Sequence, residues 1–399
     1  MLRFLTAGES HGPQLTVVLD GFPAGVAIDP EKINFQLARR QKGYGRGGRM
    51  QIEQDRVEIV SGVRLGISTG GPITLVIKNK DWANWSDIMS ANPPDGKDAS
   101  LESKIAARRV TSPRPGHADL VGGIKYRHHD LRNVLERASA RETTARTAVG
   151  ALVRQLLEHF DVEFGSHAVR IGQVALLDYK LPSDLSQLRE VTEASEVRCI
   201  DKDTEAKMIA EIERARMAGD SVGGEVEIIV RRLPVGLGSY AQWSDRFDSR
   251  LAAALMSIPS VKGVEIGLGF AAAEQYGSQV HDEIVYTPGR ERRKKGYGRS
   301  SNNAGGIEGG ITNGEDVVAR VASKPLATLN RPLQTVDIIS KQTASAAVER
   351  TDNCVVPALA VICEAMAALV AADAFLAKFG GDSMEEIRRN YNSFLDDPY

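Results

Sequence analysis

The sequence has few cysteines, few aromatic residues and almost no excess of charge. Only three of its 399 residues are cysteine, which is too few for a disulfide framework or a cysteine zinc site and is typical of a reducing compartment. Aromatic residues make up 6% and the formal net charge is −2, whereas a nucleic-acid-binding module is expected to be basic and to add aromatic stacking residues. We therefore expect a cytoplasmic protein that does not bind nucleic acid.

Long uninterrupted hydrophobic runs are also missing. The first residues, MLRFLTAGESHG, lack the apolar stretch of a signal peptide. The most apolar segment, residues 357–379, contains Glu364 and Asp373, and a membrane span tolerates such charges poorly. The segment is therefore interpreted as a buried helix, and no membrane partner is expected.

The hydrophobic pattern predicts helices and strands that do not alternate regularly. Helices are expected over residues 29–38, 133–160, 203–218, 246–257, 357–379 and 383–395. Strands are expected over residues 2–6, 14–19, 57–63, 73–78, 163–176, 225–231, 264–267, 317–322 and 334–338. Residues 91–116 are predicted to be a long loop. This order favours an α+β fold over a doubly wound sheet, and the lack of a clear linker favours a single domain over residues 1–399.

Arginines and glycines alternate in a segment that has no carboxylate between Lys32 and Ile52. Its cationic residues are Arg39, Arg40, Lys42, Arg46 and Arg49. Guanidinium groups match two oxygens of a phosphate or carboxylate at once. An ordinary solvated basic loop is the alternative, but the interleaved glycines favour an anion site.

Two histidines lie in glycine-containing turns. His11 follows Ser10 in the turn Gly8–Gly12, and His117 follows the rigid Arg114-Pro115-Gly116. Both are candidate general acids. A nucleophilic Ser10 is disfavoured, because adjacent residues seldom form a nucleophile–base pair and no G-x-S-x-G elbow is present. The tandem His128-His129 is expected to lie on the surface.

Two further segments have unusual composition. Residues 137–143 place small residues inside an expected helix, where a flat ring or phosphate could lie, although their spacing alone favours an ordinary helix with an exposed Arg141–Glu142 face. Residues 305–314 contain too many glycines for a regular helix or strand and predict a close-approach loop. Matches to G-x-G-x-x-G/A at residues 43–48, 236–241 and 267–272 lack the strand–turn–helix context of a dinucleotide site.

Together these motifs resemble the chorismate synthase family. The most diagnostic stretches are Gly8-Glu9-Ser10-His11-Gly12, Arg137-Ala138-Ser139-Ala140-Arg141-Glu142-Thr143 and Arg350-Thr351-Asp352-Asn353-Cys354. The resemblance extends from Thr6 to about Asp382, nearly the whole chain. It implies a β-α-β sandwich in which antiparallel sheets enclose helices, and a homotetramer.

The resemblance also implies a reaction. A carbon–oxygen lyase would catalyse the trans-1,4-elimination of phosphate from 5-enolpyruvylshikimate-3-phosphate to give chorismate, the last step of the shikimate pathway. Reduced FMN would take part without net redox change. NADPH would act only indirectly, by supplying an external source of reduced flavin.

Site residues follow from the same resemblance. His11 would protonate the departing phosphate, His117 would act as an acid toward the flavin, and Asp352 would work with the flavin N5 to take up the substrate proton. The substrate would be bound by Ser10, Arg40, Arg46, Arg49, Arg114 and Arg350. The flavin would be bound by Arg137, Ala138, Ser139, Pro259, Ser260, Gly309, Lys324, Pro325, Leu326, Ala327, Thr328 and Arg350. No metal is expected.

Three features depart from the family pattern, and one of them is Asn303, which stands where Arg or His is common before the glycine-rich loop. Pro259-Ser260 stands where Gln-Ala or Asn-Ala is usual, and proline lacks a backbone donor. Residues 287–302 form an unusually long basic loop, which is either a solvated hairpin or a surface that steers anions to the site. A phosphoryl-transfer enzyme is the rival from another class, but it would normally need a Walker-type loop or a carboxylate metal cluster, and neither motif is present.

Overall fold

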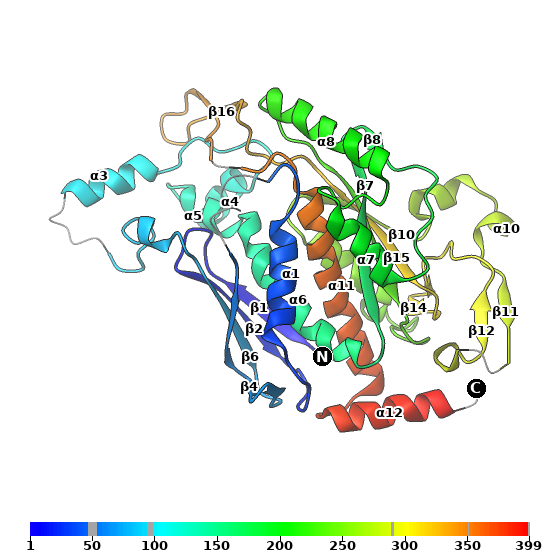
Figure 1. Cartoon of the computed structure of the whole chain (residues 1–399). Helices are drawn as coiled ribbons and strands as arrows, with labels where there is room; N and C mark the ends of the chain where they lie inside the picture. The colour runs from blue at the N-terminus through cyan, green and yellow to red at the C-terminus, as the bar shows by residue number, and fades with distance from the viewer. Residues whose placement is uncertain (47–53, 94–98, 289–290, 350, 398–399) are drawn as a thin grey trace.

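Two antiparallel sheets enclose the central helices of the protein (Figure 1). The computed structural model describes residues 1–46, 54–93, 99–288, 291–349 and 351–397. The first sheet has the order β1-β2-β6-β3 and comprises β1 (Arg3–Ala7), β2 (Gln14–Asp20), β6 (Ile73–Lys78) and β3 (Val57–Ser61). The second has the order β10-β15-β9-β7-β8 and comprises β10 (Val261–Ile266), β15 (Val317–Ser323), β9 (Gly224–Arg231), β7 (Glu163–Ile171) and β8 (Val174–Ala175).

Three helices fill the space between the sheets. They are α1 (Pro30–Gln41), α6 (Thr143–Glu158) and α11 (Val356–Phe379), and Figure 1 shows them between the blue strands and the green and yellow ones. Strand β2 buries Leu15, Val17 and Leu19 at alternate positions, so one face of its sheet packs on the helices. The predicted α+β sandwich of antiparallel sheets around helices is confirmed.

Helix α11 is the longest helix and lies in the core. It is long and apolar enough to cross a membrane by length and composition, but 94% of its most apolar window is buried inside the protein. The helix carries buried apolar residues on all of its faces, which is typical of a helix at the centre of a protein core. Pro357 lies in its first turn and Gly380, with a φ of +46°, follows its last residue.

Helices α6 and α11 are in close contact at Gly150. A Cβ atom added to Gly150 would lie 2.5 Å from both the Cβ and the carbonyl oxygen of Ala365. Because backbone atoms cannot rotate away, only glycine fits at this crossing.

Replacing Gly150 with valine is expected to lower the free energy of unfolding by about 1–3 kcal/mol or more, because overpacking forces the two helices apart. Urea denaturation measures the change. Gly71→Ala is the control, since the nearest atom to its added Cβ is Thr69 Oγ1 at 3.8 Å. A Gly150→Val protein as stable as the Gly71→Ala protein would contradict the proposed close contact.

Most of the other predicted elements are confirmed within a few residues. Asp29 caps α1 by accepting a hydrogen bond from the Glu31 amide, as its position predicts. The predicted helices near residues 203–218, 246–257 and 383–395 correspond to α8 (Lys202–Met217), α9 (Phe247–Met256) and α12 (Met384–Asp396). The last predicted strand is β16 (Gln334–Val336), which pairs with β17 (Thr343–Ser345).

The predictions for residues 91–116 and 133–160 are wrong in part. The predicted loop contains α3 (Ala99–Arg108), which has no buried residue among its described side chains and so lacked a strong apolar pattern. The single predicted helix is divided into α5 (Arg132–Arg137), the 3₁₀ turn η2 (Ala140–Glu142) and α6. The break occurs because Ser139 adopts an extended conformation and its side chain accepts a hydrogen bond from the Arg141 amide, as an N-cap does.

The sequence pattern did not predict α4 or α7. Helix α4 (Asp119–Tyr126) is short, and α7 (Leu185–Ala194) covers the outer face of β7. The remaining short elements are β4 (Val63–Arg64), β5 (Ile67–Ser68), η1 (Trp82–Asn84), η3 (Trp243–Asp245), η4 (Gly269–Glu274), α10 (Gly277–Val280), β11 (Ile284–Tyr286), η5 (Arg292–Lys294), β12 (Tyr297–Arg299), β13 (Ile307–Glu308) and β14 (Ile311–Thr312).

Candidate functional site

The turn between β1 and β2 is fixed to α5 through one carboxylate. The His11 amide donates to Glu136 Oε2 at 2.8 Å, and His11 Nδ1 lies 2.9 Å from Oε1 and 3.0 Å from Oε2 of the same side chain. The Ser10 amide donates to the Glu136 carbonyl oxygen at 3.0 Å. The orientation of His11 is therefore set by a residue 125 positions away in the chain.

An indole ring lies against His11. The imidazole of His11 stacks on Trp85 with ring centroids 3.8 Å apart and an interplanar angle of 25°. The guanidinium groups of Arg108 and Arg132 lie 4.8 and 5.3 Å from the centroid of the same indole. Trp85 is buried, and its Nε1 donates to Asp81 Oδ2 at 3.1 Å.

Arg40 brings a buried positive charge to the C-terminal end of α1. Its Nε donates to Thr143 Oγ1 at 3.0 Å and its Nη2 donates to the Ala140 carbonyl at 2.9 Å. Its Nη1 is buried without a hydrogen-bond partner among the described residues and lies 4.0 Å from Asp55 Oδ2. Burial, reinforced by the nearby charge of Arg46, lowers the pKa of Arg40 to about 10. Because the buried Nη1 of Arg40 has no hydrogen-bond acceptor among the described residues, an anionic ligand would be favoured here.

Asp352 lies beside Arg46. Arg46 Nη1 is 2.8 Å from Asp352 Oδ2, and the Asn353 amide donates to the Gly45 carbonyl at 2.8 Å. Gly45 has a φ of +81°, and a Cβ added there would lie 3.1 Å from the Cβ and 3.3 Å from the backbone nitrogen of Cys354. Glycine at position 45 is therefore what allows the arginine loop to pack against the segment that carries Asp352.

The second candidate acid, His117, also contacts a buried carboxylate. His117 Nδ1 lies 2.6 Å from Asp119 Oδ1, and Arg114 donates to Asp119 from Nε at 2.8 Å and from Nη2 at 3.0 Å. Burial alone would raise the pKa of Asp119, but hydrogen bonds from His117 and Arg114 outweigh it and lower that pKa well below its usual range. Arg114 also donates from Nη1 to Thr328 Oγ1 at 2.7 Å.

Residues 324–328 join the loop of His117 to the rest of the site. Lys324 Nζ donates to the Gly116 carbonyl, and Ser221 Oγ donates to the Leu326 carbonyl at 2.7 Å. Burial, with help from the charge of Lys262, lowers the pKa of Lys324. Val222, the neighbour of Ser221, donates from its amide to the Asn353 carbonyl at 2.9 Å. Residues 324–328 are therefore linked through Ser221 and Val222 to the residue that follows Asp352.

The turn at Pro259-Ser260 lies against the same segment. The Ser260 carbonyl accepts from the Lys324 amide at 3.0 Å, and the hydroxyls of Ser260 and Ser323 lie 2.8 Å apart. Ser260 has a φ of +77°. The unusual dipeptide is therefore part of the predicted cofactor region even though proline removes one backbone donor.

Residues 137–143 connect the His11 turn to Arg40. Ser139 Oγ donates to Ser10 Oγ at 3.2 Å, and Arg137 Nη2 donates to the Thr6 carbonyl at 2.9 Å. The prediction that Arg141 and Glu142 form an exposed face is wrong. Both are buried, and Arg141 Nη1 pairs with Asp55 Oδ1 at 2.8 Å.

The structure therefore brings most of the predicted residues into one connected network. The predicted residues in it are Ser10, His11, Arg40, Arg46, Arg114, His117, Ser139, Ser260, Lys324, Leu326, Thr328 and Asp352. Arg49 and Arg350 lie outside the described residues. Gly309 is apart: it lies between β13 and β14, and Figure 1 shows β14 on the opposite side of the view from α4 and α5.

Three site residues were not singled out by the sequence as acting on the histidines. Glu136 and Trp85 contact His11, and Asp119 contacts His117. Asp119 is two residues from its histidine, so the spacing offered a signal. Glu136 and Trp85 are distant in the chain, and nothing in the sequence pattern pairs them with His11.

In the described part of the basic loop at residues 287–302, which joins β11 to β12, basic side chains form ion pairs and hydrogen bonds with other parts of the chain. Lys294 Nζ lies 2.7 Å from Glu315 Oε2, Arg292 pairs with Asp396, and Lys295 donates to the Asp397 carbonyl at 2.6 Å. These contacts anchor the loop to α12. They favour a structural interpretation over the steering of anions.

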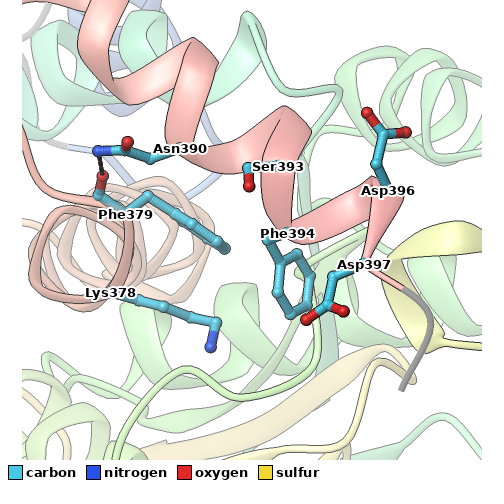
Figure 2. A pocket seen from close by; sticks show the side chains of 7 residues that line it. All are labelled: Lys378, Phe379, Asn390, Ser393, Phe394, Asp396 and Asp397. Carbon is cyan, nitrogen blue, oxygen red and sulfur yellow. Dashed lines mark hydrogen bonds between the residues drawn. The ribbon is translucent and has the colours of Figure 1, made fainter.

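An open hollow of about 730 Å³ lies beside this anchor (Figure 2). Lys378 and Phe379 from the end of α11 and Phe394 from α12 line it, and Figure 2 shows the Lys378 side chain reaching toward the ring of Phe394. Of the predicted catalytic and binding residues that the structure describes, none lines this hollow. It is therefore separate from the candidate site.

Comparisons with known proteins agree on one family. The family model described as chorismate synthase matches residues 2–376. A chorismate synthase of Geobacter sulfurreducens is 54% identical over 398 residues, covering 99% of each chain, and one of Brevibacillus brevis is 52% identical over 393 residues, covering 98% of each. A crystal structure of chorismate synthase superposes with a TM-score of 0.78 at 42% identity, covering 99% of this chain and 97% of the other.

Proposed function

This chain belongs to the chorismate synthase family of lyases, which catalyse the last step of the shikimate pathway, and we propose that the network around His11, Arg40 and His117 is its active site. The observation that carries the assignment is the buried, incompletely paired guanidinium of Arg40 in a region that also holds Arg46, Arg114 and two histidines backed by carboxylates. Such a site suits a substrate that carries a phosphate and two carboxylates.

The substrate, 5-enolpyruvylshikimate-3-phosphate, would be held by the cationic part of the network. Ser10, Arg40, Arg46 and Arg114 are the described residues that we assign to it, with Arg49 and Arg350 as further candidates. Arg40 Nη1 needs an acceptor that the described residues do not supply. A phosphate or carboxylate oxygen would satisfy it and would be stabilised as negative charge develops on the leaving group.

The family requires a reduced flavin, and the residues present fit FMN. Arg137, Ala138 and Ser139 lie at the break between α5 and α6, where small side chains leave backbone and hydroxyl donors accessible, and residues 324–328 with Pro259-Ser260 supply further polar groups. When bound, reduced FMN supplies electron density while phosphate departs and recovers it afterward, chemistry that no side chain offers. NADPH would enter only as the source of electrons for the flavin.

The protein's own groups would handle the protons. His11 would donate a proton from its imidazole to an oxygen of the departing phosphate. His117, held by Asp119, would act as the second acid. Asp352, beside Arg46, would accept the substrate proton at its carboxylate.

Phosphate release in an anaerobic assay tests the proposed reaction directly. The purified protein should release phosphate from 5-enolpyruvylshikimate-3-phosphate, with equal formation of chorismate, when reduced FMN is added. Oxidised FMN should give no turnover. Phosphate release without a flavin, or without chorismate, would reject the assignment.

Replacing Arg40 with methionine is expected to raise KM for the phosphorylated substrate about 10- to 100-fold, because a charge-assisted hydrogen bond contributes about 1.5–3 kcal/mol. Steady-state kinetics at fixed reduced FMN measures it. Arg214→Met, which removes a mostly exposed arginine on α8, is the matched control and should leave KM unchanged. Equal KM values for both variants would remove Arg40 from the substrate site.

We further propose a cytoplasmic, single-domain enzyme that assembles as a homotetramer, with small molecules and its own copies as partners and no nucleic acid or membrane. Exposed aromatic side chains in residues 270–276 support assembly, because Phe270 is 79% exposed and Tyr276 is 82% exposed. Gly309, which is apart from the other flavin residues within one chain, would then contribute to the site of a neighbouring copy. Sedimentation at micromolar concentration would test the tetramer.

The reducing equivalents are proposed to come from outside this protein. The three dinucleotide-like glycine motifs, at residues 43–48, 236–241 and 267–272, do not carry the complete sequence fingerprint of a nicotinamide site. We therefore expect no aerobic turnover with NADPH and oxidised FMN alone. Turnover under those conditions would show that the protein reduces its own flavin.

A further inference from the structure

His11 is held by two residues to which the proposed reaction assigns no role. Glu136 is completely buried as a side chain and directs both carboxylate oxygens at His11, and Trp85 lies flat against the imidazole ring. We propose that Glu136 and Trp85 are positioning residues that fix His11 so that it donates its proton from Nε2. The inference rests on the proposed role of His11 as the acid for the departing phosphate.

The carboxylate decides which nitrogen of His11 exchanges a proton. An ionised carboxylate can only accept hydrogen bonds, so the Nδ1 atom at 2.9 and 3.0 Å from Glu136 must carry a hydrogen. A proton passed to a phosphate oxygen therefore leaves from Nε2. After the transfer His11 is neutral, with its remaining hydrogen on Nδ1 and still bonded to Glu136.

The surroundings of Glu136 keep it ionised. Burial alone would raise its pKa, but the hydrogen bond and charge of His11, followed by the hydrogen bond from Arg132, lower it. Arg132 Nη1 donates to Glu136 Oε1 at 3.0 Å, and its Nη2 donates to Glu349 Oε1 at 2.9 Å. The carboxylate thus has a fixed charge and fixed geometry, and it stabilises the protonated imidazole electrostatically.

Trp85 fixes the plane of the ring. A carboxylate on Nδ1 leaves the imidazole able to rock about that contact, and the indole stacked at 3.8 Å blocks one side. Trp85 is held in turn by its hydrogen bond to Asp81 and by the guanidinium of Arg108 at 4.8 Å from its ring centroid. The two residues restrain His11 along different directions, so both are required.

The test replaces Glu136 with glutamine, which keeps the shape and removes the charge. We expect kcat to fall about 10- to 100-fold with KM changed less than about threefold, because supporting contacts of this kind typically contribute that much. The alkaline limb of the kcat–pH profile should move to lower pH. Glu136→Asp should recover part of the loss, and Trp85→Leu should lower kcat without moving the profile.

Nitrogen NMR of the flavin-free protein gives a readout that is independent of turnover. At a pH where the imidazole is neutral, the ¹⁵N shifts of His11, assigned by their loss in His11→Asn, should show hydrogen on Nδ1 in the wild type and a substantial fraction on Nε2 in Glu136→Gln. The distant buried pair His167–Glu227, with Nε2 and Oε1 3.2 Å apart, supplies the matched control. Glu227→Gln should change the shifts of His167 alone and leave kcat unchanged.

The outcomes separate this inference from the proposed function. Unchanged His11 shifts and a kcat within about threefold of wild type in Glu136→Gln would overturn the inference. If that variant does not fold, the kcat values of Glu136→Asp and Trp85→Leu decide, and values within about threefold of the wild type in both would overturn the inference. If instead His11→Asn turns over normally, the acid role of His11 fails, while the NMR result still establishes whether Glu136 sets its tautomer.

Discussion

Replacing His11 with asparagine is expected to lower kcat by about 10²- to 10⁴-fold, the usual contribution of a positioned general acid. Asparagine retains a hydrogen-bonding group of similar length but has no proton to give at neutral pH. The proposed substrate contacts of Arg40 and Arg46 are left in place, so KM should change much less than kcat. Phosphate release under anaerobic conditions with excess reduced FMN measures both.

The surface histidine provides the control for this substitution. His129 is exposed, and His129→Asn should behave as the wild type. Flavin affinity, measured by fluorescence quenching, should be the same in both variants, because the residues that we assign to FMN do not include either histidine. A His11→Asn enzyme with kcat within threefold of the His129→Asn enzyme would exclude His11 as the acid.

The sequence predicted the core helices well because their signals are local. Residues 357–379 are apolar on every side and are bounded by Pro357 and Gly380, so both the existence and the end of α11 were readable. The same reasoning failed at Ser139. Apolar periodicity runs on through residues 133–160, and only the side-chain cap of Ser139 on the Arg141 amide interrupts the helix.

The sequence predicted which residues belong to the candidate site, but it did not predict which of them contact one another. Glycine-bracketed arginines and histidines identified His11, Arg40 and His117 as chemistry-bearing residues. The partner of His11, however, is 125 residues away, and such a pairing arises only when the turn between β1 and β2 meets α5. Long-range pairing is also why Arg141 was misjudged as exposed, since Asp55 neutralises it in the interior.

Two adjacent arginines at the C-terminal end of α1 have different environments. Arg39 and Arg40 are adjacent in the chain but face opposite environments, because successive helical residues are about 100° apart around the axis. Arg40 reaches the candidate site, whereas Arg39 is buried against α11, where its Nη1 and Nη2 donate to Glu364 at 2.8 and 3.0 Å. The position of Arg40 therefore depends on a charge network in the core.

Glu364 is the centre of that network, and replacing it with glutamine is expected to lower the free energy of unfolding by about 3–5 kcal/mol. Arg154 Nη1 also donates to Glu364 at 3.1 Å, and Ser166 Oγ does so at 2.6 Å. Removing the negative charge would leave two buried guanidiniums facing each other. Guanidinium-chloride denaturation measures the loss. Glu225→Gln, which breaks a partly exposed pair with Arg170, should cost less than about 1 kcal/mol.

Acid titration of stability gives the same network a second, sharper test. Burial would raise the pKa of Glu364, but Arg39 and Arg154 outweigh it and lower the pKa to about 2 from an ordinary value of 4.5. Because the folded state holds this proton more weakly than the unfolded state, the stabilisation is complete above pH 4.5 and is lost as the pH falls toward 2. The stability difference between wild type and Glu364→Gln should therefore shrink across that window. A difference that stays constant from pH 5 to pH 2.5 would mean that the charge of Glu364 does not hold α1 to α11.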